Sequence, residues 1–324
     1  MATNSSPLIK IGLLYTPPPA YLDRLQAQFP EIAFASLPSE GDSSSLLDCD
    51  AILAWRLEAS DVEAAPRLRW VQWVGAGVEE ASLEVLKSRG IVLTNNRGVH
   101  APNIAEHLLM MMLAFTRRLP TLLRLQEERH WIHWSEHERA GPIGELNGST
   151  LVIVGAGNIG SALATRADAF GMRVSMVGRR TRQSTRPVAG IDQLDSILPQ
   201  ADHVAICLPL TRRTNRLFDA QRLARMKRGA FLYNVGRGPI VDTDALVDAL
   251  TSGQIGGAGL DVCDPEPLTD DHPLWASPNT ILTAHTAGIT PRYWDRGVEI
   301  FAENIRRFLN GEELMNTVDW DQGY

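Results

Sequence analysis

The segment that most restricts the fold is an apolar run followed at once by three spaced glycines, LVIVGAGNIG, at residues 151–160. Four apolar residues predict a buried strand, and the pattern beyond Gly160 predicts a helix, so the glycines lie in a tight strand-to-helix turn. Gly155 permits the turn, Gly157 lets a phosphate approach the backbone, and Gly160 lets helix and strand pack closely. The segment therefore predicts a dinucleotide site with its phosphates at a helix N-terminus; a glycine-rich turn without a ligand is the alternative.

The next strand lacks the acid that ordinarily binds the adenosine ribose of such a ligand. That carboxylate is expected about 20 residues further on, where RVSMV is instead followed by Gly178. Arg179, Arg180 and Arg182 come directly afterwards. Guanidinium groups suit bidentate phosphate binding, so we expect the site to prefer NADP(H), with NAD(H) left open as a second cofactor. A solvated surface loop is the alternative reading of the arginines.

Short apolar segments alternate with amphipathic helices in two successive series, which indicates βαβ units and parallel sheets. The expected strands are LIKIGLLY, DAILAW, LRWVQWV and GIVLTN in the first series, and STLVIVG, RVSMV, DHVAICL, GAFLYNVG, IGGAGLDV and NTILTAH in the second. The apolar helix NIAEHLLMMMLAFTRRL separates the series, and the helix RYWDRGVEIFAENIRRFLNG closes the chain, ending at Gly311.

Composition excludes several classes of protein. A formal charge of −7 without a dense basic stretch argues against nucleic acid as a partner. Three widely spaced cysteines indicate neither a disulfide framework nor a zinc cluster. The polar start and lysine-containing apolar run predict a first strand instead of a secretion signal. No apolar run approaches the length of a membrane span. We therefore expect a cytoplasmic protein.

Three motifs each place one reactive side chain after an expected strand. YNVGRGPIVD contains Arg237, GLDVCDPEPL contains Glu266, and LTAHTAG contains His285. Ligands of open α/β sheets bind at the carboxyl ends of strands, so the three side chains could converge on one reacting centre. Taken singly, they could be a turn residue, a solvated charge and a core histidine. His130, His133 and His137, in a stretch that also contains Trp134, have spacings that could place them on one face of a helix and bind a metal. No cysteine accompanies them, so we expect an exposed or interfacial helix instead.

Taken together, these segments resemble the D-isomer-specific 2-hydroxyacid dehydrogenase family almost from end to end. The motifs that carry the resemblance are VGAGVE (74–79), the glycine turn, CLPLTRRTN (207–215), NVGRGPIVD (234–242), GLDVCDPEPL (259–268), HPLW (272–275) and TAHTAG (283–288). Within the family, the similarity is greatest to the glyoxylate/hydroxypyruvate reductase branch. Three segments indicate this branch: AWR (54–56), LRWVQWVGAGVE (68–79) and GRR (178–180). The sequence departs from the family at Cys263, where an aromatic residue is common, and at Ala284, where proline is common.

The resemblance implies an α/β fold of two Rossmann-like, doubly wound parallel-sheet domains with a cleft between them. A discontinuous, flavodoxin-like substrate domain would comprise residues 1–98 and 289–324. The dinucleotide-binding domain would comprise residues 99–288. The resemblance also implies a homodimer.

The resemblance further implies NADP(H)-dependent reduction of a small 2-keto acid, such as glyoxylate or hydroxypyruvate, to the D-2-hydroxy acid. Arg237 would bind the carboxylate and polarise the carbonyl. His285 would donate a proton to the carbonyl oxygen, and Glu266 would orient the imidazole. A formate or phosphite dehydrogenase on the same scaffold, or a corepressor-like dinucleotide sensor that binds peptides, are the alternatives. Glu266 disfavours formate dehydrogenase, since that branch carries glutamine at this position.

The remaining site residues come from the same resemblance. Asp261 would bind the nicotinamide carboxamide, and the backbone amides of Gly75, Ala76 and Gly77 would hold the substrate carboxylate. Arg56 would add a positive charge at the mouth of the cleft; a cap on the core is the alternative. The other expected cofactor contacts are Asn158, Ile159, Leu208, Pro209, Thr214, Val235, Gly236 and Gly288.

Overall fold

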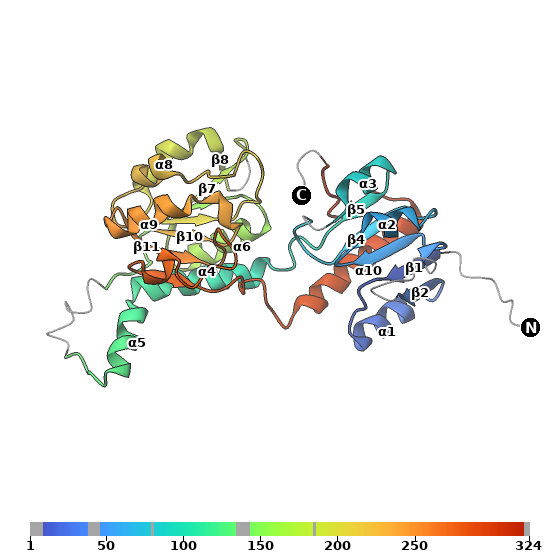
Figure 1. Cartoon of the computed structure of the whole chain (residues 1–324), viewed down its shortest axis with the longest axis horizontal. Coiled ribbons are helices and arrows are strands. Elements are labelled where there is room, and N and C mark those ends of the chain that lie inside the picture. Colours follow the sequence, from blue (N-terminus) through green and yellow to red (C-terminus); the bar gives the residue numbers. More distant parts are fainter. Residues whose placement is uncertain (1–8, 38–45, 79–80, 134–142, 184–185, 321–324) are drawn as a thin grey trace, which may run out of the picture. The chain divides into compact units, whose positions relative to one another are not determined.

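The computed structural model describes residues 9–37, 46–78, 81–133, 143–183 and 186–320. The chain divides into two compact units, an N-terminal unit of residues 1–99 and 290–324 and a central unit of residues 100–289 (Figure 1). Each boundary lies one residue beyond the position expected from the sequence. Both units are built on parallel sheets, so the expected α/β class with two doubly wound domains is confirmed.

The N-terminal unit has a five-stranded parallel sheet in the order β2-β1-β3-β4-β5. Its elements are β1 (Ile9–Leu13), α1 (Pro19–Gln28), β2 (Ile32–Ser36), β3 (Ala51–Ala54), α2 (Ala59–Glu63), β4 (Trp70–Trp73), α3 (Leu83–Ser88), β5 (Val92–Thr94) and α10 (Tyr293–Asn310). Consecutive strand residues point to opposite faces. One core therefore forms on the side of α1 and α10, around Ile11 and Trp70, and the other around Val71 and Leu86.

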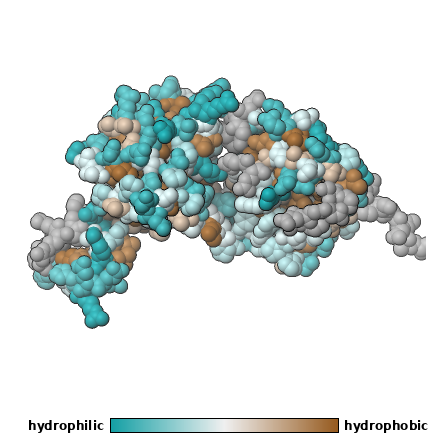
Figure 2. Space-filling view, in the orientation of Figure 1, coloured by the Kyte–Doolittle hydropathy of each residue, from teal (hydrophilic) through white to brown (hydrophobic). Residues whose placement is uncertain are grey.

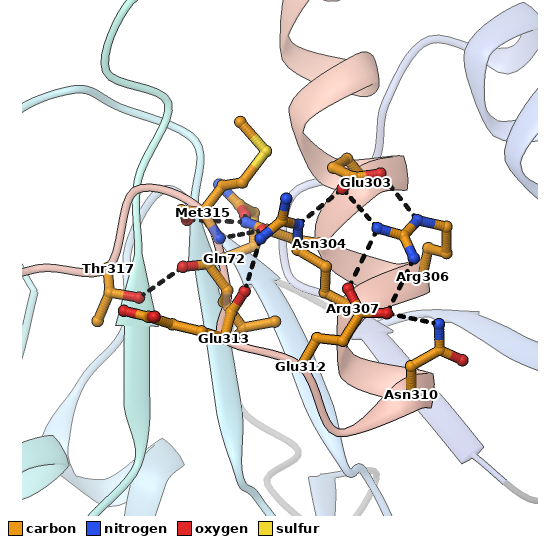
Figure 3. Close-up of polar contacts among 11 residues, drawn as sticks. Gln72, Glu303, Asn304, Arg306, Arg307, Asn310, Glu312, Glu313, Met315 and Thr317 are labelled. Carbon is orange, nitrogen blue, oxygen red and sulfur yellow. Dashed lines mark hydrogen bonds and ion pairs between the residues drawn. The ribbon is translucent and has the colours of Figure 1, made fainter.

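Helix α10 returns the end of the chain to this sheet, and a buried amide fixes it there. Asn304 is fully buried and donates through Nδ2 to Gln72 Oε1 on β4, at 3.0 Å. Its Oδ1 accepts from the backbone N–H of Met315, at 2.7 Å, so the segment after α10 is attached to the helix (Figure 3). That segment continues to β5, where the N–H of Val318 donates to the carbonyl of Leu93 at 2.8 Å.

Replacing Asn304 by alanine should lower the free energy of unfolding by about 1–3 kcal/mol, because the change leaves buried partners without hydrogen bonds. Urea unfolding measures the effect. Arg306→Ala is the matched control on the same helix. Arg306 pairs with Glu303 and Glu312 at the surface (Figure 3), where ion pairs contribute little, so its midpoint should move less. Equal shifts for both variants would contradict the role of the buried amide.

The central unit has a seven-stranded parallel sheet in the order β12-β11-β10-β9-β6-β7-β8. Its elements are α4 (Ala101–Thr116), α5 (Leu119–Glu127), β6 (Thr150–Val154), α6 (Asn158–Ala169), β7 (Arg173–Gly178), β8 (Val188–Gly190), α7 (Leu194–Ile197), β9 (His203–Ile206), α8 (Ala220–Arg225), β10 (Ala230–Asn234), α9 (Thr243–Thr251), β11 (Ile255–Leu260) and β12 (Thr280–Leu282). Single 3₁₀ turns are Ile191–Gln193, Leu198–Gln200, Gly238–Ile240 and Pro273–Ala276. The strand order reverses between β6 and β9, the point at which doubly wound sheets bind ligands.

Both faces of this sheet are covered, which explains why β6 reads as a continuous apolar run. Leu151 and Ile153 face the core that α4 and α6 cover, whereas Val152 and Val154 face the core beneath α7, α8 and α9. All four side chains are inaccessible to solvent. The glycine turn that follows β6 is therefore anchored in a strand whose last four residues are fully buried.

Among the described helices of nine or more residues, α5 (labelled in Figure 1) is the one in which no residue is buried. Leu119, Leu122 and Leu123 lie at helical spacing on one face, and each is at least 40% exposed. Hydrophobic surface is visible among polar side chains in this part of the molecule (Figure 2). An exposed apolar stripe of this kind is typical of a surface that another protein chain covers.

Three local features differ from the sequence expectations. Strand β2 was not predicted, and neither was β8, which has only three residues at the sheet edge and is too short to show a period. The helix expected across His130 and His133 is wrong for residues 130–133, because α5 ends at Glu127; His137 and Trp134 lie outside the described residues. Among the helices that the structure describes, none is sufficiently long and apolar to cross a lipid bilayer.

Candidate active site

The glycine turn after β6 has the shape that a dinucleotide phosphate requires. Gly155 has φ +126°, and a Cβ there would lie 2.4 Å from the carbonyl oxygen of Cys207, so only glycine fits. A Cβ on Gly160 would lie 2.0 Å from the carbonyl oxygen of Gly155, which shows how tightly α6 packs on the turn. Around Gly157, by contrast, no atom would lie within 4 Å of a Cβ. The turn therefore leaves open space at the exposed N-terminus of α6, where free N–H groups attract anions.

The arginines of the expected NADP(H) site begin beside this turn. Gly178 ends β7 in a buried position, and a Cβ on it would lie 3.5 Å from the Cβ of Ala156 and 2.9 Å from Cγ1 of Val188. Arg179, Arg180 and Arg182 are exposed. Arg182 pairs its backbone with Val188 through hydrogen bonds of 2.9 and 3.0 Å, and its guanidinium approaches the carbonyl oxygen of Ala156 at 3.4 Å. Three cationic side chains thus leave the sheet next to the glycine turn.

The ends of β9 and β10 border the same turn. A Cβ on Gly155 would lie 3.1 Å from the backbone nitrogen of Leu208. A Cβ on Gly236 would lie 2.5 Å from the carbonyl oxygen of Leu208. Beyond Leu208, the hydroxyl of Thr214 donates to the carbonyl of Pro209 at 2.7 Å and closes a short turn. The expected cofactor residues on these loops therefore lie at one edge of the sheet.

An imidazole and a carboxylate meet beyond β12. Nδ1 of His285 lies 2.6 Å from Oε1 of Glu266, although the two residues are 19 positions apart in the sequence. The side chain of His285 is 50% exposed, so a ligand can reach its ring. The remaining ring nitrogen, Nε2, is available for proton transfer, because the carboxylate fixes which nitrogen faces the protein. The pairing of His285 with Glu266 expected from the motifs is thus present in the structure.

Asp261 lies immediately after β11 and is 4% exposed. Its carboxylate accepts hydrogen bonds from the hydroxyl of Thr283 and from the backbone N–H groups of Thr286 and Ala287. A cofactor contact through Asp261, as the sequence predicts, would have to share this carboxylate. Thr283 was not predicted as a site residue. The feature that could have indicated it is its position as the first polar residue after β12. At the end of the same segment, the carbonyl of Gly288 lies 2.8 Å from Nδ1 of His100.

Arg237 follows β10 and is partly buried. Its guanidinium donates through Nη1 to the carbonyl of Gly236, at 2.9 Å. The next residue, Gly238, is so close to Cys263 that a Cβ would lie 1.8 Å from the carbonyl oxygen of that cysteine. The segment that carries Arg237 therefore packs directly against the segment that leads to Glu266.

The expected substrate residues Arg56, Gly75, Ala76 and Gly77 belong to the N-terminal unit. The Arg56 side chain is 78% exposed and pairs with Glu58 at 3.1 Å. Two asparagines after β5, which the sequence analysis missed, order the glycine segment. The side-chain amide of Asn95 donates to the carbonyl of Ala76 at 2.7 Å. The backbone N–H of Asn96 donates to the carbonyl of Gly75 at 3.0 Å.

Metal ligation finds no support in the described part of the chain. No group of three or more histidine, cysteine, aspartate or glutamate side chains in it is arranged to hold a metal ion. Burial raises the pKa of the Cys207 thiol to about 12, which keeps it protonated beside the glycine turn.

A doubly wound sheet, a phosphate-binding glycine turn and an imidazole–carboxylate pair define a dinucleotide-dependent dehydrogenase. Residues 109–287 match the family model described as D-isomer specific 2-hydroxyacid dehydrogenase, NAD binding domain. The chain belongs to this family. It is an oxidoreductase with a nicotinamide dinucleotide as cofactor.

Individual relatives extend the match over most of the chain. It is 35% identical over 275 residues to a glyoxylate reductase of Thermofilum pendens, covering 83% of this chain and 80% of that protein. It is 36% identical over 295 residues to a glyoxylate reductase of Aeropyrum pernix, covering 87% and 86%. A D-isomer specific 2-hydroxyacid dehydrogenase from Xanthobacter autotrophicus Py2, solved in complex with NADPH and MES, matches with a TM-score of 0.82 and 30% identity over 98% of this chain and 99% of that one.

Proposed function

We propose that this protein reduces a small 2-keto acid of the glyoxylate or hydroxypyruvate type to the D-2-hydroxy acid, with NADPH as the preferred cofactor. One observation carries the proposal: Nδ1 of His285 lies 2.6 Å from Oε1 of Glu266, so Nε2 is the ring nitrogen that remains to donate a proton to a substrate oxygen. Relatives named glyoxylate reductase, matched over most of their length, support the substrate class. The positive charges of Arg179, Arg180 and Arg182 beside the glycine turn support NADPH as the cofactor.

The chain's own groups would divide the work as follows. The bound nicotinamide supplies the hydride. Arg237 holds the carboxylate of the keto acid and polarises its carbonyl through its planar guanidinium. Nε2 of His285 donates a proton to the carbonyl oxygen, and Glu266 keeps the ring oriented while it does so. In the N-terminal unit, we assign substrate binding to the backbone amides of Gly75, Ala76 and Gly77 and to the positive charge of Arg56. Residues 1–98 with 289–324 thus serve as the substrate domain, and residues 99–288 as the cofactor domain.

A His285→Asn protein should bind NADPH normally but reduce glyoxylate and hydroxypyruvate at least about 100-fold more slowly, because it lacks the proton donor. Absorbance of NADPH over a panel of 2-keto acids measures turnover. His272→Asn is the matched control, since His272 only accepts from the N–H of Leu274 and asparagine can do the same. Rapid turnover by His285→Asn would remove His285 from the mechanism. An inactive wild-type protein on every keto acid would overturn the proposed function.

Preference for NADPH rests on the charge beside the glycine turn. Arg179, Arg180 and Arg182 leave the sheet where a ribose-binding acid would otherwise stand, and the buried Gly178 offers no carboxylate. Guanidinium groups bind a 2′-phosphate through strong charged hydrogen bonds, whereas NADH presents only hydroxyls there. The Xanthobacter relative was solved in complex with NADPH, which supports NADPH as a ligand.

Replacing Arg179 and Arg180 by alanine should weaken NADPH binding by about 1–3 kcal/mol for each lost charged hydrogen bond, and should leave NADH binding nearly unchanged. Titration of cofactor fluorescence with each dinucleotide gives the two affinities. Arg173→Ala removes an exposed arginine from the other end of β7 and should affect neither. Equal losses for both cofactors would contradict the assignment of the arginines.

We further propose that the protein is a homodimer and that α5 contributes to the interface, because its leucines at positions 119, 122 and 123 are exposed in the described part of the chain. A Leu122→Glu, Leu123→Glu double variant should be monomeric by light scattering coupled to size exclusion. Arg124→Glu, on another face of the same helix, should stay dimeric. A double variant with the mass of the wild-type protein would exclude α5 from the interface. The cytoplasmic location expected from the sequence stays a prediction.

A further inference from the structure

We propose that Asp261 and Thr283 are positioning residues that hold His285 in its working orientation, a role that rests on the proposed function. They connect β11 to the segment that carries the imidazole. The two side chains form a hydrogen bond with each other, and this bond attaches residues 283–287 to the end of the sheet.

The register of the sheet brings the two side chains together. Leu260 pairs with Leu282 in the parallel ladder of β11 and β12, so Asp261 and Thr283 are the next residues on adjacent strands. The Thr283 hydroxyl donates to Oδ1 of Asp261 at 2.7 Å. The same oxygen accepts from the backbone N–H groups of Thr286 at 2.9 Å and Ala287 at 3.1 Å. One carboxylate oxygen thus gathers three donors that flank the catalytic histidine on both sides.

Residues 283–287 need these supporting contacts because their backbone is strained. Ala284 has φ +45° and His285 has φ +56°, so two consecutive residues with side chains lie in the left-handed region. Residues other than glycine rarely adopt this conformation unless the surroundings enforce it. The N–H of His285 donates to the carbonyl of Asp261 at 2.7 Å, within the same set of contacts. The contacts of Asp261 therefore surround both strained residues.

A partly buried histidine of α4 contacts Thr283 from the other side. Nε2 of His107 lies 2.9 Å from the Thr283 hydroxyl oxygen. Because that hydroxyl gives its only proton to the carboxylate, it accepts from His107, and the imidazole carries its proton on Nε2. Burial lowers the pKa of His107, which favours a neutral ring whose single proton lies on Nε2. The position of Thr283 is thereby fixed from two sides, by α4 and by β11.

The experiment removes the hydroxyl and follows the segment in the protein without cofactor. Thr283→Val and Thr283→Ala should both raise hydrogen exchange of the peptide containing residues 283–288 by about tenfold, because a hydrogen bond to a buried charge is lost. Thr283→Ser restores the hydroxyl and should exchange within about twofold of the wild type. Thr280→Val, on β12, is the matched control. Its hydroxyl contacts only the carbonyl of Pro278, at 3.3 Å, and this variant should also match the wild type.

Turnover supplies the second measurement. Both variants without the hydroxyl should show a kcat lower by about tenfold with an unchanged Kd for NADPH, and the serine variant should recover kcat. Exchange that rises equally throughout the protein, or exchange and kcat that stay at wild-type values in both variants, would overturn the inference. A wild-type protein inactive on keto acids would instead overturn the proposed function. The exchange of residues 283–288 would then still decide whether Asp261 and Thr283 hold the segment.

Discussion

The carboxylate of Asp261 is the contact on which the arrangement of the site depends. It lies at the end of a buried strand, where water cannot replace its partners, and it binds donors from a segment that would otherwise leave the sheet without support. The imidazole that follows is half-exposed and pairs with Glu266, and the backbone N–H of His285 donates to the carbonyl of Asp261. A rigid interior thus supports a reactive group at the surface.

Parallel strands explain why residues far apart in the sequence act together. The carboxyl ends of β6, β9, β10, β11 and β12 lie along one edge of the sheet, and the glycine turn, Leu208, Arg237, Asp261 and the His285 segment each follow one of these strands. Close backbone contacts at Gly155 and Gly238 hold neighbouring loops against one another. The N-terminal unit uses the same principle, since Asn95 and Asn96 follow β5 and order the segment after β4.

Sequence patterns predicted the two units, most strands and the principal helices, because buried parallel strands read as apolar runs and the glycine turn has a definite spacing. Strand β8 escaped prediction, since its three residues carry no period. The pairing of His285 with Glu266 could be expected from the motifs and is present. The contacts of Thr283 and His107 could not be predicted, because they depend on strand register and on which face of α4 meets the sheet. Ala284 shows the same limit: the sequence reveals the absence of a proline, but not a φ of +45°, which proline cannot adopt.

The close approach of Gly178 to Val188 has a consequence for any attempt to exchange one dinucleotide for the other. An aspartate introduced at position 178 would bring a Cβ to 2.9 Å from the valine side chain, so the strand edge would have to yield before the new carboxylate could reach a ribose. Valine is branched next to its backbone and has little room to rotate away. Evolution or design would therefore need a smaller residue at position 188 first, and the order of the two changes would matter.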